Sequence, residues 1–239
     1  MTGDGGTIST LDASVADAAG GAAGGAVAEP GVGEAPGSAA LRLAPPRSHD
    51  EDRSEMPTRL ERIADFVNTT DLMNPIEGLA TPEDLHAWLV AHGLLDAGVR
   101  LTAADLVAAI AVREALRELI EGNAGHPTSD GALAVLGRAA GAAPVAVAFD
   151  AEGGATFEPV ASGIHAVFGR VFADIVTAMA DGSWSRLKAC RNDECRWAYY
   201  DASKNRSGRW CSMASCGNRM KGRAYRRRAR SSASARALS

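Results

Sequence analysis

Apolar residues recur with a helical period through most of the chain between residues 58 and 180. The run TRLERIADFVNT places Leu60, Ile63, Phe66 and Val67 at i, i+3, i+6 and i+7, as expected for one face of a helix. Similar runs predict four more helices, at residues 82–92, 102–123, 129–141 and 162–180. The longest of these predicted helices is LTAADLVAAIAVREALRELIEGN, and its apolar stripe is available for a core.

Start and stop signals support the boundaries of these helices. Thr81 is a predicted N-cap, with Pro82 in the first turn, and His92 precedes a glycine that can end the helix. Thr102 and Asp105 have the spacing of a capping box, with Asp in the place of the usual Glu.

The period changes at PVAVAFDAEGGATFEPV, residues 144–160. Two short β-prone runs flank Glu152-Gly153-Gly154, which predicts a β-hairpin. The expected fold class is therefore α+β, with a mostly helical body and a short β-hairpin.

Composition divides the chain into four segments. Residues 1–57 are rich in Gly, Ala, Pro and acids, so a disordered leader is expected; a mis-assigned start codon explains the same stretch equally well. The body then covers residues 58–182. A small basic module covers 183–230, and a flexible tail is expected at 231–239.

Charge is distributed unevenly along the chain. From Arg186 to Ser239 there are 15 Lys and Arg against 3 Asp and Glu, a balance of +12. The remainder carries 10 basic and 26 acidic residues, a balance of -16. A basic end on an acidic body indicates a polyanion as partner.

All four cysteines of the chain lie close together, at Cys190, Cys195, Cys211 and Cys216. They form two C-x4-C pairs separated by fifteen residues, and no histidine lies among them. Four thiolates suit one tetrahedral structural zinc ion and leave no open position for a water ligand. Disulfides and an iron–sulfur centre are the weaker alternatives.

The residues around the four cysteines predict a small treble-clef-like zinc finger, which follows the helical body and consists of a hairpin and a helix around one ion. Leu187–Ala189 and Trp197–Tyr200 flank a knuckle that carries the first cysteine pair. Ser212 or Ser215 is a candidate cap for a helix that has Cys216 in or near its first turn. So small a module has little core, so metal binding is expected to contribute to its folding energy.

The segment after Cys216, GNRMKGRAYRRRAR, predicts a helix with a basic stripe. Arginine donates two parallel hydrogen bonds to phosphate or to guanine edges, so this stripe indicates nucleic-acid binding. A solvated tail, or one that docks on the acidic body, is the alternative. The candidate contact residues are Arg219, Lys221, Arg223, Arg226, Arg227, Arg228 and Arg230.

The body offers weaker signals. Asp65, Asn68 and Arg113 are candidates for a small-molecule pocket, although Asn68 also suits a helix end and Arg113 a surface charge. No nucleophile–base pair, phosphate loop or metal-ligand cluster is recognisable in the body, so no enzymatic activity is expected. No signal peptide or continuous span of about 20 apolar residues is recognisable, which indicates a cytoplasmic protein without a membrane partner.

The segment CRWAYYDASKNRSGRWCSMASCGNRMKGRAYRRR resembles the CGNR zinc finger, named for the run at Cys216 to Arg219. The body resembles the ABATE domain that usually precedes this finger, through DFVNT at residues 65–69 and REALR at 113–117. The resemblance covers about residues 58–230. It implies a bacterial, stress-induced transcriptional regulator with zinc-dependent DNA binding, whose body is a sensor or an oligomerisation unit. A homodimer is compatible with it. One alternative is an RNA-binding or ribosome-associated zinc protein, and the other is a ligand-binding or enzymatic body that the finger only tethers.

Overall fold

The computed structural model describes residues 55–237 and the side chains of residues 55–232. The predicted disordered leader, 1–57, lies outside the described residues except for its last three. Of these, Met56 is buried in the core and Pro57 directly precedes the first helix. Described structure therefore begins slightly before the predicted boundary.

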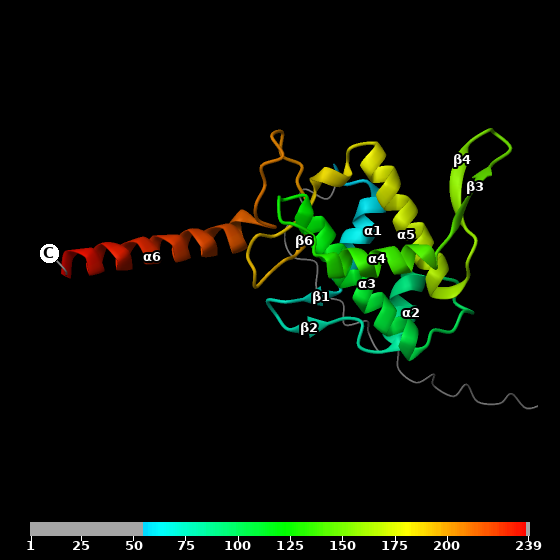
Figure 1. Cartoon of the computed structure of the whole chain (residues 1–239), viewed down its shortest axis with the longest axis horizontal. Coiled ribbons are helices and arrows are strands. Elements are labelled where there is room, and N and C mark those ends of the chain that lie inside the picture. The colour runs from blue at the N-terminus through cyan, green and yellow to red at the C-terminus, as the bar shows by residue number, and fades with distance from the viewer. Residues whose placement is uncertain (1–54, 238–239) are drawn as a thin grey trace, which may run out of the picture. The chain divides into compact units, whose positions relative to one another are not determined.

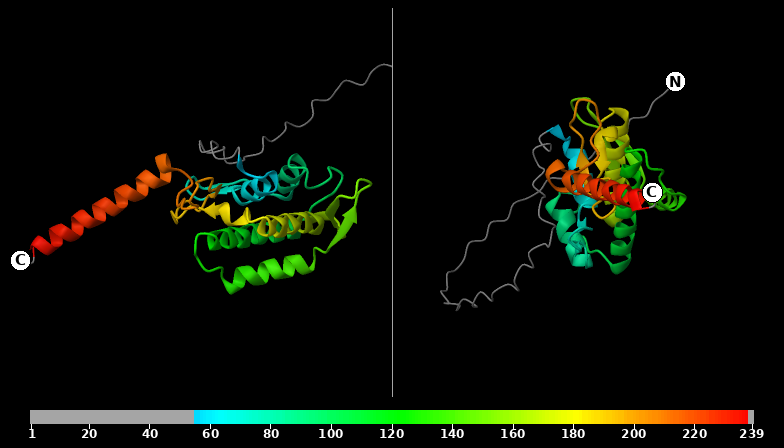
Figure 2. Two further views of the ribbon diagram at one scale, coloured as in Figure 1. Left: turned by 90° about the horizontal axis from the view of Figure 1, so that it is seen from above. Right: turned by 90° about the vertical axis from the view of Figure 1, so that its left-hand side faces the viewer.

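The described part of the body contains five helices: α1 (Thr58–Val67), α2 (Pro82–Ala91), α3 (Ala103–Gly122), α4 (Asp130–Gly141) and α5 (Gly163–Ala180). Helix α1 contacts both α3 and α5, α4 contacts the same two helices, and α2 contacts α3 (Figure 1). Figure 2 shows α1 and α4 on opposite sides of α3 and α5. Their apolar faces form one core around Trp88, Leu116, Ile120 and Phe168.

The predicted caps are present. The side chain of Thr81 accepts a hydrogen bond from the backbone N–H of Asp84, and Thr102 does the same for Asp105. Both acids return a bond to the backbone of their threonine, so both helices begin with a complete capping box. Gly93, which follows the C-cap of α2, has a φ of 66°, a left-handed conformation that favours glycine.

The predicted hairpin is formed by β3 (Val145–Phe149) and β4 (Ala155–Pro159), paired antiparallel with Val147 opposite Phe157. A second hairpin, β1 (Thr70–Asp71) with β2 (Ile76–Glu77), was not predicted. Its turn is held by Asp71, whose Oδ1 accepts hydrogen bonds from the backbone N–H groups of Met73 and Asn74. This turn brings Met73 towards the finger.

Helix α5 is the one helix in the described part of the chain that is long and apolar enough to cross a membrane by length and composition alone. Its apolar residues include Ile164, Val167, Phe168 and Val171, which are buried in the core of the body. A helix that packs one face into a helical core shows this pattern. The expectation that the protein has no membrane partner stays a prediction.

The finger continues the same core. It consists of the short turn η2 (Trp184–Arg186), β5 (Leu187–Ala189), β6 (Ala198–Tyr200), the π-turn η3 (Met213–Gly217) and helix α6 (Asn218–Ala237). Side chains from η2, β5 and β6 lie in the core cluster of the body: Trp184, Leu187, Ala189, Ala198 and Tyr200. The fold class is confirmed, and the core extends across the predicted boundary at residue 182.

Helix α6 is longer than the sequence predicts. The tail expected to be flexible from residue 231 is helical as far as Ala237. Ser231 and Ser232 donate hydrogen bonds from their hydroxyls to the carbonyls of Arg227 and Arg228, so neither serine stops the helix. Alanines at 233, 235 and 237 then supply the strongest helix former.

Candidate metal centre and nucleic-acid interface

The four cysteines meet at one buried point. Their Sγ atoms all lie within 4.8 Å of one another, with Cys195 to Cys211 at 3.7 Å and Cys211 to Cys216 at 3.8 Å. Sulfurs placed about 2.3 Å from a central zinc ion form a tetrahedron with edges of about 3.8 Å. The donor set therefore fits one structural zinc ion with a closed coordination shell, as predicted from the spacing.

The thiols influence one another strongly. Hydrogen bonds from Cys195 and Cys211 lower the pKa of Cys190 to about 4. Hydrogen bonding to Cys190 and Cys195, together with burial, raises the pKa of Cys211. Several thiolates at such short distances repel one another, and a divalent cation is what allows all four sulfurs to ionise together.

The first cysteine pair lies on a knuckle between β5 and β6. The backbone N–H of Cys190 donates to Trp197 O at 2.9 Å, which closes the hairpin. The carbonyl of Asn192 then accepts from the N–H groups of Cys195 and Arg196, at 2.7 and 3.1 Å. Arg196 has a φ of 47°, so the chain leaves the knuckle through a left-handed residue.

The second pair is positioned by the start of the basic helix. Ser212 caps η3 by accepting a hydrogen bond from the N–H of Ser215 at 3.2 Å, as the sequence suggested for one of these serines. Gly217 follows Cys216, and a Cβ there would lie 2.7 Å from the sulfur of Met213. Gly217 is therefore required by this close approach, whereas a Cβ at Gly222 would meet nothing closer than 3.5 Å.

Asn192 is a site residue that the sequence interpretation missed. Its side chain is fully buried, and its Nδ2 donates towards Cys216 Sγ at 3.7 Å. Hydrogen bonds of this kind stabilise a thiolate and orient the ligand. The available signal was an uncharged polar residue in the otherwise charged run between Cys190 and Cys195.

A buried ion pair holds the loop that leads to Cys211. Lys188 Nζ donates to Asp201 Oδ2 at 2.6 Å, and Ser203 and Gly208 donate to the same carboxylate. Burial raises the pKa of Asp201, but these hydrogen bonds outweigh it and the pKa lies below its usual value. Gly208 is required here because a Cβ would lie 2.8 Å from the carboxylate carbon of Asp201.

The aromatic residues around the cysteines are packed, whereas Tyr225 on α6 is exposed. Trp210 and Tyr199 lie against the cysteine cluster, and Tyr200 is in the body core. Burial raises the pKa of Tyr199. Both tyrosines of β6 are packed, because one face of this strand lies on the body core and the other covers the cysteines.

Two of the three predicted pocket residues have internal hydrogen-bond partners. Both polar atoms of the Asn68 side chain bond to the backbone of Ala198. Arg113 is buried and pairs with both carboxylate oxygens of Glu77, at 2.6 and 2.7 Å. Asp65 is half-buried on α1 and also has an interaction. The structure therefore gives Asn68 and Arg113 internal bonding roles, and a ligand pocket stays a prediction.

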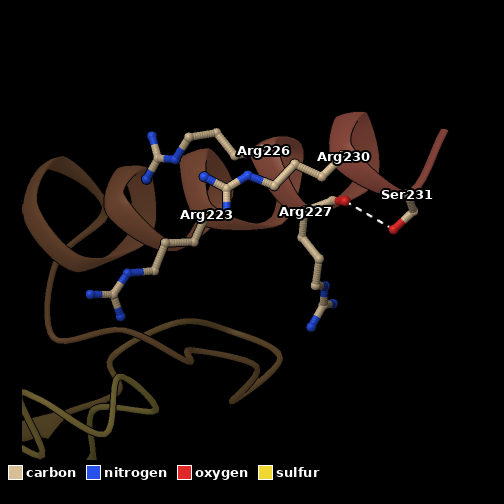
Figure 3. Close-up of a pocket in the computed structure, with 5 residues that line it drawn as sticks. All are labelled: Arg223, Arg226, Arg227, Arg230 and Ser231. Atoms are coloured by element: carbon tan, nitrogen blue, oxygen red, sulfur yellow. Dashed lines mark hydrogen bonds between the residues drawn. The ribbon is translucent and has the colours of Figure 1, made fainter. Parts of the chain in front are cut away.

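The predicted basic residues are all exposed on α6. Four of them line a shallow groove together with Ser231, and Figure 3 shows them on successive turns of the helix: Arg223, Arg226, Arg227 and Arg230. Both carboxylate oxygens of Glu194, on the zinc knuckle, accept from Arg223 at 2.7 Å, and Arg219 lies 4.0 Å from the same carboxylate. Lys221 and Arg228 lie outside this groove.

The fold and the site together define a zinc-finger protein, in which a helical body continues into a four-cysteine centre and a basic helix. A family model described as "ABATE: Putative stress-induced transcription regulator" matches residues 60–182, and the CGNR zinc finger model matches residues 186–229. The chain belongs to the ABATE family and carries a CGNR zinc finger, as the sequence resemblance indicated. No curated protein matches the chain.

Proposed function

We propose that this protein is a zinc-dependent transcriptional regulator that binds duplex DNA through the basic face of α6. The observation that carries the proposal is the placement of that face. Helix α6 begins at Asn218, two residues after the ligand Cys216, and all seven predicted basic residues are exposed on it. Zinc thus anchors the helix at its start, while its guanidinium groups remain available for phosphate.

The geometry of α6 favours duplex DNA over RNA. A helix of 20 residues is about 30 Å long, and the major groove of B-DNA admits an α-helix. The major groove of A-form RNA is too narrow for side chains to read. Trp210 and Tyr199 pack against the cysteine cluster, whereas Tyr225 is exposed on α6 and is available to stack on an unpaired base. Binding to RNA or to the ribosome remains the second candidate because phosphate attraction is common to both nucleic acids.

The arginine face provides the test. Replacing Arg226 and Arg230 by Gln removes two charges of one groove at i, i+4 spacing. Affinity for duplex DNA should fall, and the slope of log K against log salt should flatten by about 2, since each phosphate contact contributes about 0.9. The double variant Arg100→Gln/Arg138→Gln is the matched control, because both arginines are exposed on the body.

Titration with duplex DNA, duplex RNA and single-stranded RNA at one salt concentration separates the two candidates. Tighter binding of duplex DNA, lost in the α6 variant and kept in the control variant, is the expected outcome. Equal slopes for both variants would remove α6 from the interface. Tighter binding of RNA would move the function to the second candidate.

The body is proposed to sense a signal or to form a homodimer. Exposed apolar side chains on the β3–β4 hairpin, at Val147, Phe149 and Phe157, are compatible with a protein partner. The expectations of a cytoplasmic location and of no enzymatic activity stay predictions.

A further inference from the structure

The body binds the backbone of the zinc knuckle directly. Asn68 follows α1, and its Nδ2 donates to Ala198 O at 2.9 Å while its Oδ1 accepts from Ala198 N at 2.8 Å. Asn68 and Ala198 are both buried. The amide of Asn68 therefore bonds to β6 as a neighbouring strand would. These two bonds fix the outer edge of β6 at Ala198, three residues after Cys195.

Arg117 makes a second connection from the middle of α3. Its guanidinium is fully buried and donates to Val67 O at 2.5 Å and to Arg196 O at 3.0 Å, while Glu114 balances its charge. Burying a charged group is unfavourable unless its hydrogen bonds are satisfied. One of the hydrogen bonds that Arg117 needs is accepted by the carbonyl of Arg196, the residue that follows the ligand Cys195.

Arg196 is also held through its own side chain. Its Nε and Nη2 donate to the two carboxylate oxygens of Glu121 on α3, at 2.5 and 3.1 Å. Because the left-handed φ of Arg196 is unfavourable for a residue with a Cβ, the surrounding structure has to impose it. Helix α3 imposes it at both the backbone and the side chain of this residue.

The β1–β2 turn approaches the opposite part of the centre. Met73 packs against the cysteine cluster, and its Sδ lies 3.9 Å from Cys216 Sγ. The body therefore approaches both cysteine pairs. Asn68 and α3 bond to the residues that follow Cys195, and Met73 lies against Cys216.

We propose that the ABATE body is the positioning frame of the zinc centre, with Asn68, Arg117 and Glu121 as positioning residues for the knuckle. The body holds the left-handed exit from Cys195, so the first ligand pair is preorganised before metal binds. Zinc occupancy and the local stability of α1 and α3 are consequently coupled. This inference goes beyond the proposed function, since it holds whatever polyanion α6 binds.

The rate of zinc loss tests the frame. Glu121→Ala in the full chain should speed zinc transfer to a chelator about tenfold, the lower end of the effect of removing an outer contact from a metal ligand. Glu118→Ala is the matched control: Glu118 lies on the same helix and is also half-buried, but it bonds to Ser129 of the body. Equal release rates for the two variants would overturn the proposal.

The absorption spectrum of the cobalt(II)-substituted protein provides a readout that a general loss of protein stability would not change. With cobalt in place of zinc, the absorption bands report the geometry of the four thiolates. The bands should shift in Glu121→Ala and in Arg117→Lys, which keeps its charge but loses the planar guanidinium whose separate nitrogens donate to the two carbonyls. Wild-type bands in Glu121→Ala contradict the proposal, even if Arg117→Lys fails to fold.

Hydrogen exchange tests the coupling in the opposite direction. Chelating zinc from the wild-type chain should increase amide exchange at residues 66–71 and 117–123 of the body, because coupling between two sites is reciprocal. The β3–β4 hairpin, residues 145–159, serves as an internal reference. Increased exchange confined to residues 186–237 would mean that the body only tethers the finger.

Discussion

At the scale of single residues, Glu194 shows how the zinc knuckle and the basic helix meet. Its carboxylate accepts two hydrogen bonds from Arg223 and lies 4.0 Å from Arg219, an arrangement that a phosphate group can also adopt. More than half of the Glu194 side chain is exposed, so the pair contributes little to stability. The chief effect of Glu194 is therefore to weaken the attraction of Arg219 and Arg223 for another anion, such as a phosphate group.

Glu194→Gln should tighten binding to duplex DNA by about 2- to 5-fold, corresponding to ~0.5–1 kcal/mol, because it releases Arg223 from a competing carboxylate. Asp193→Asn is the control, since it changes the charge equally on the same exposed loop but has no ion pair with the described side chains of α6, at residues 218–232. Fluorescence anisotropy at moderate salt measures both affinities. Equal tightening by the two variants would show that only net charge matters.

The residue scale also marks the limit of sequence reasoning. The cysteines were identified because their spacing is local and their chemistry is specific. Asn68 was assigned to a pocket or a helix end, and its actual partner is 130 positions away at Ala198. The contact of Asn192 with Cys216 depends equally on tertiary structure. Polar side chains that bond to distant backbone leave no periodic signal along the chain.

At the scale of elements, the helices, the β3–β4 hairpin and the segments that form β5 and β6 were predicted, but the two-residue strands β1 and β2 were not. Caps at Thr81, Thr102 and Ser129 act locally, so the sequence places the starts of α2, α3 and α4 correctly. The strands β1 and β2 have two residues each, too few for an alternating pattern. The β1–β2 hairpin is instead specified by the Asp71 turn and by its packing on the finger.

Helix α6 is an element whose sequence opposes its own folding. Arginines at i, i+4 repel one another at 219/223, 223/227 and 226/230, and Gly222 costs about 1 kcal/mol relative to Ala. A peptide of residues 212–237 should therefore be mostly non-helical in dilute buffer by circular dichroism. Added duplex DNA should increase its helicity, because phosphates neutralise the repulsion. A peptide that is fully helical without DNA would show that the helix needs neither zinc nor a polyanion.

At the scale of the whole molecule, the described body and the finger share one core. Strands β5 and β6 pack their apolar side chains with α1 and α3, and buried polar groups of the body bond to the knuckle. Composition and charge indicated two segments correctly, since the acidic body and the basic end differ. They carry no information on packing between segments, which is why the sequence predicts a domain boundary after residue 182 and not a shared core.

The shared core gives the body a physical route to the basic helix. A signal that changes α1 or α3 would act on the knuckle through Arg117 and Asn68, and the knuckle contacts α6 through Glu194. These contacts connect the proposed sensor to the proposed DNA-binding helix without a flexible linker between them. Zinc lies at the centre of this route.

The most direct measurement is sequencing of genomic DNA fragments retained by the purified, zinc-loaded full-length protein at near-physiological salt, beside a chelator-treated sample. A sequence-specific regulator should enrich a few sites strongly, and the enrichment should disappear on chelation. Neutralising Arg226 and Arg230 should abolish the same enrichment while zinc stays bound. Uniform or absent retention by the zinc-loaded protein would contradict DNA-directed regulation and leave α6 as a site for another polyanion.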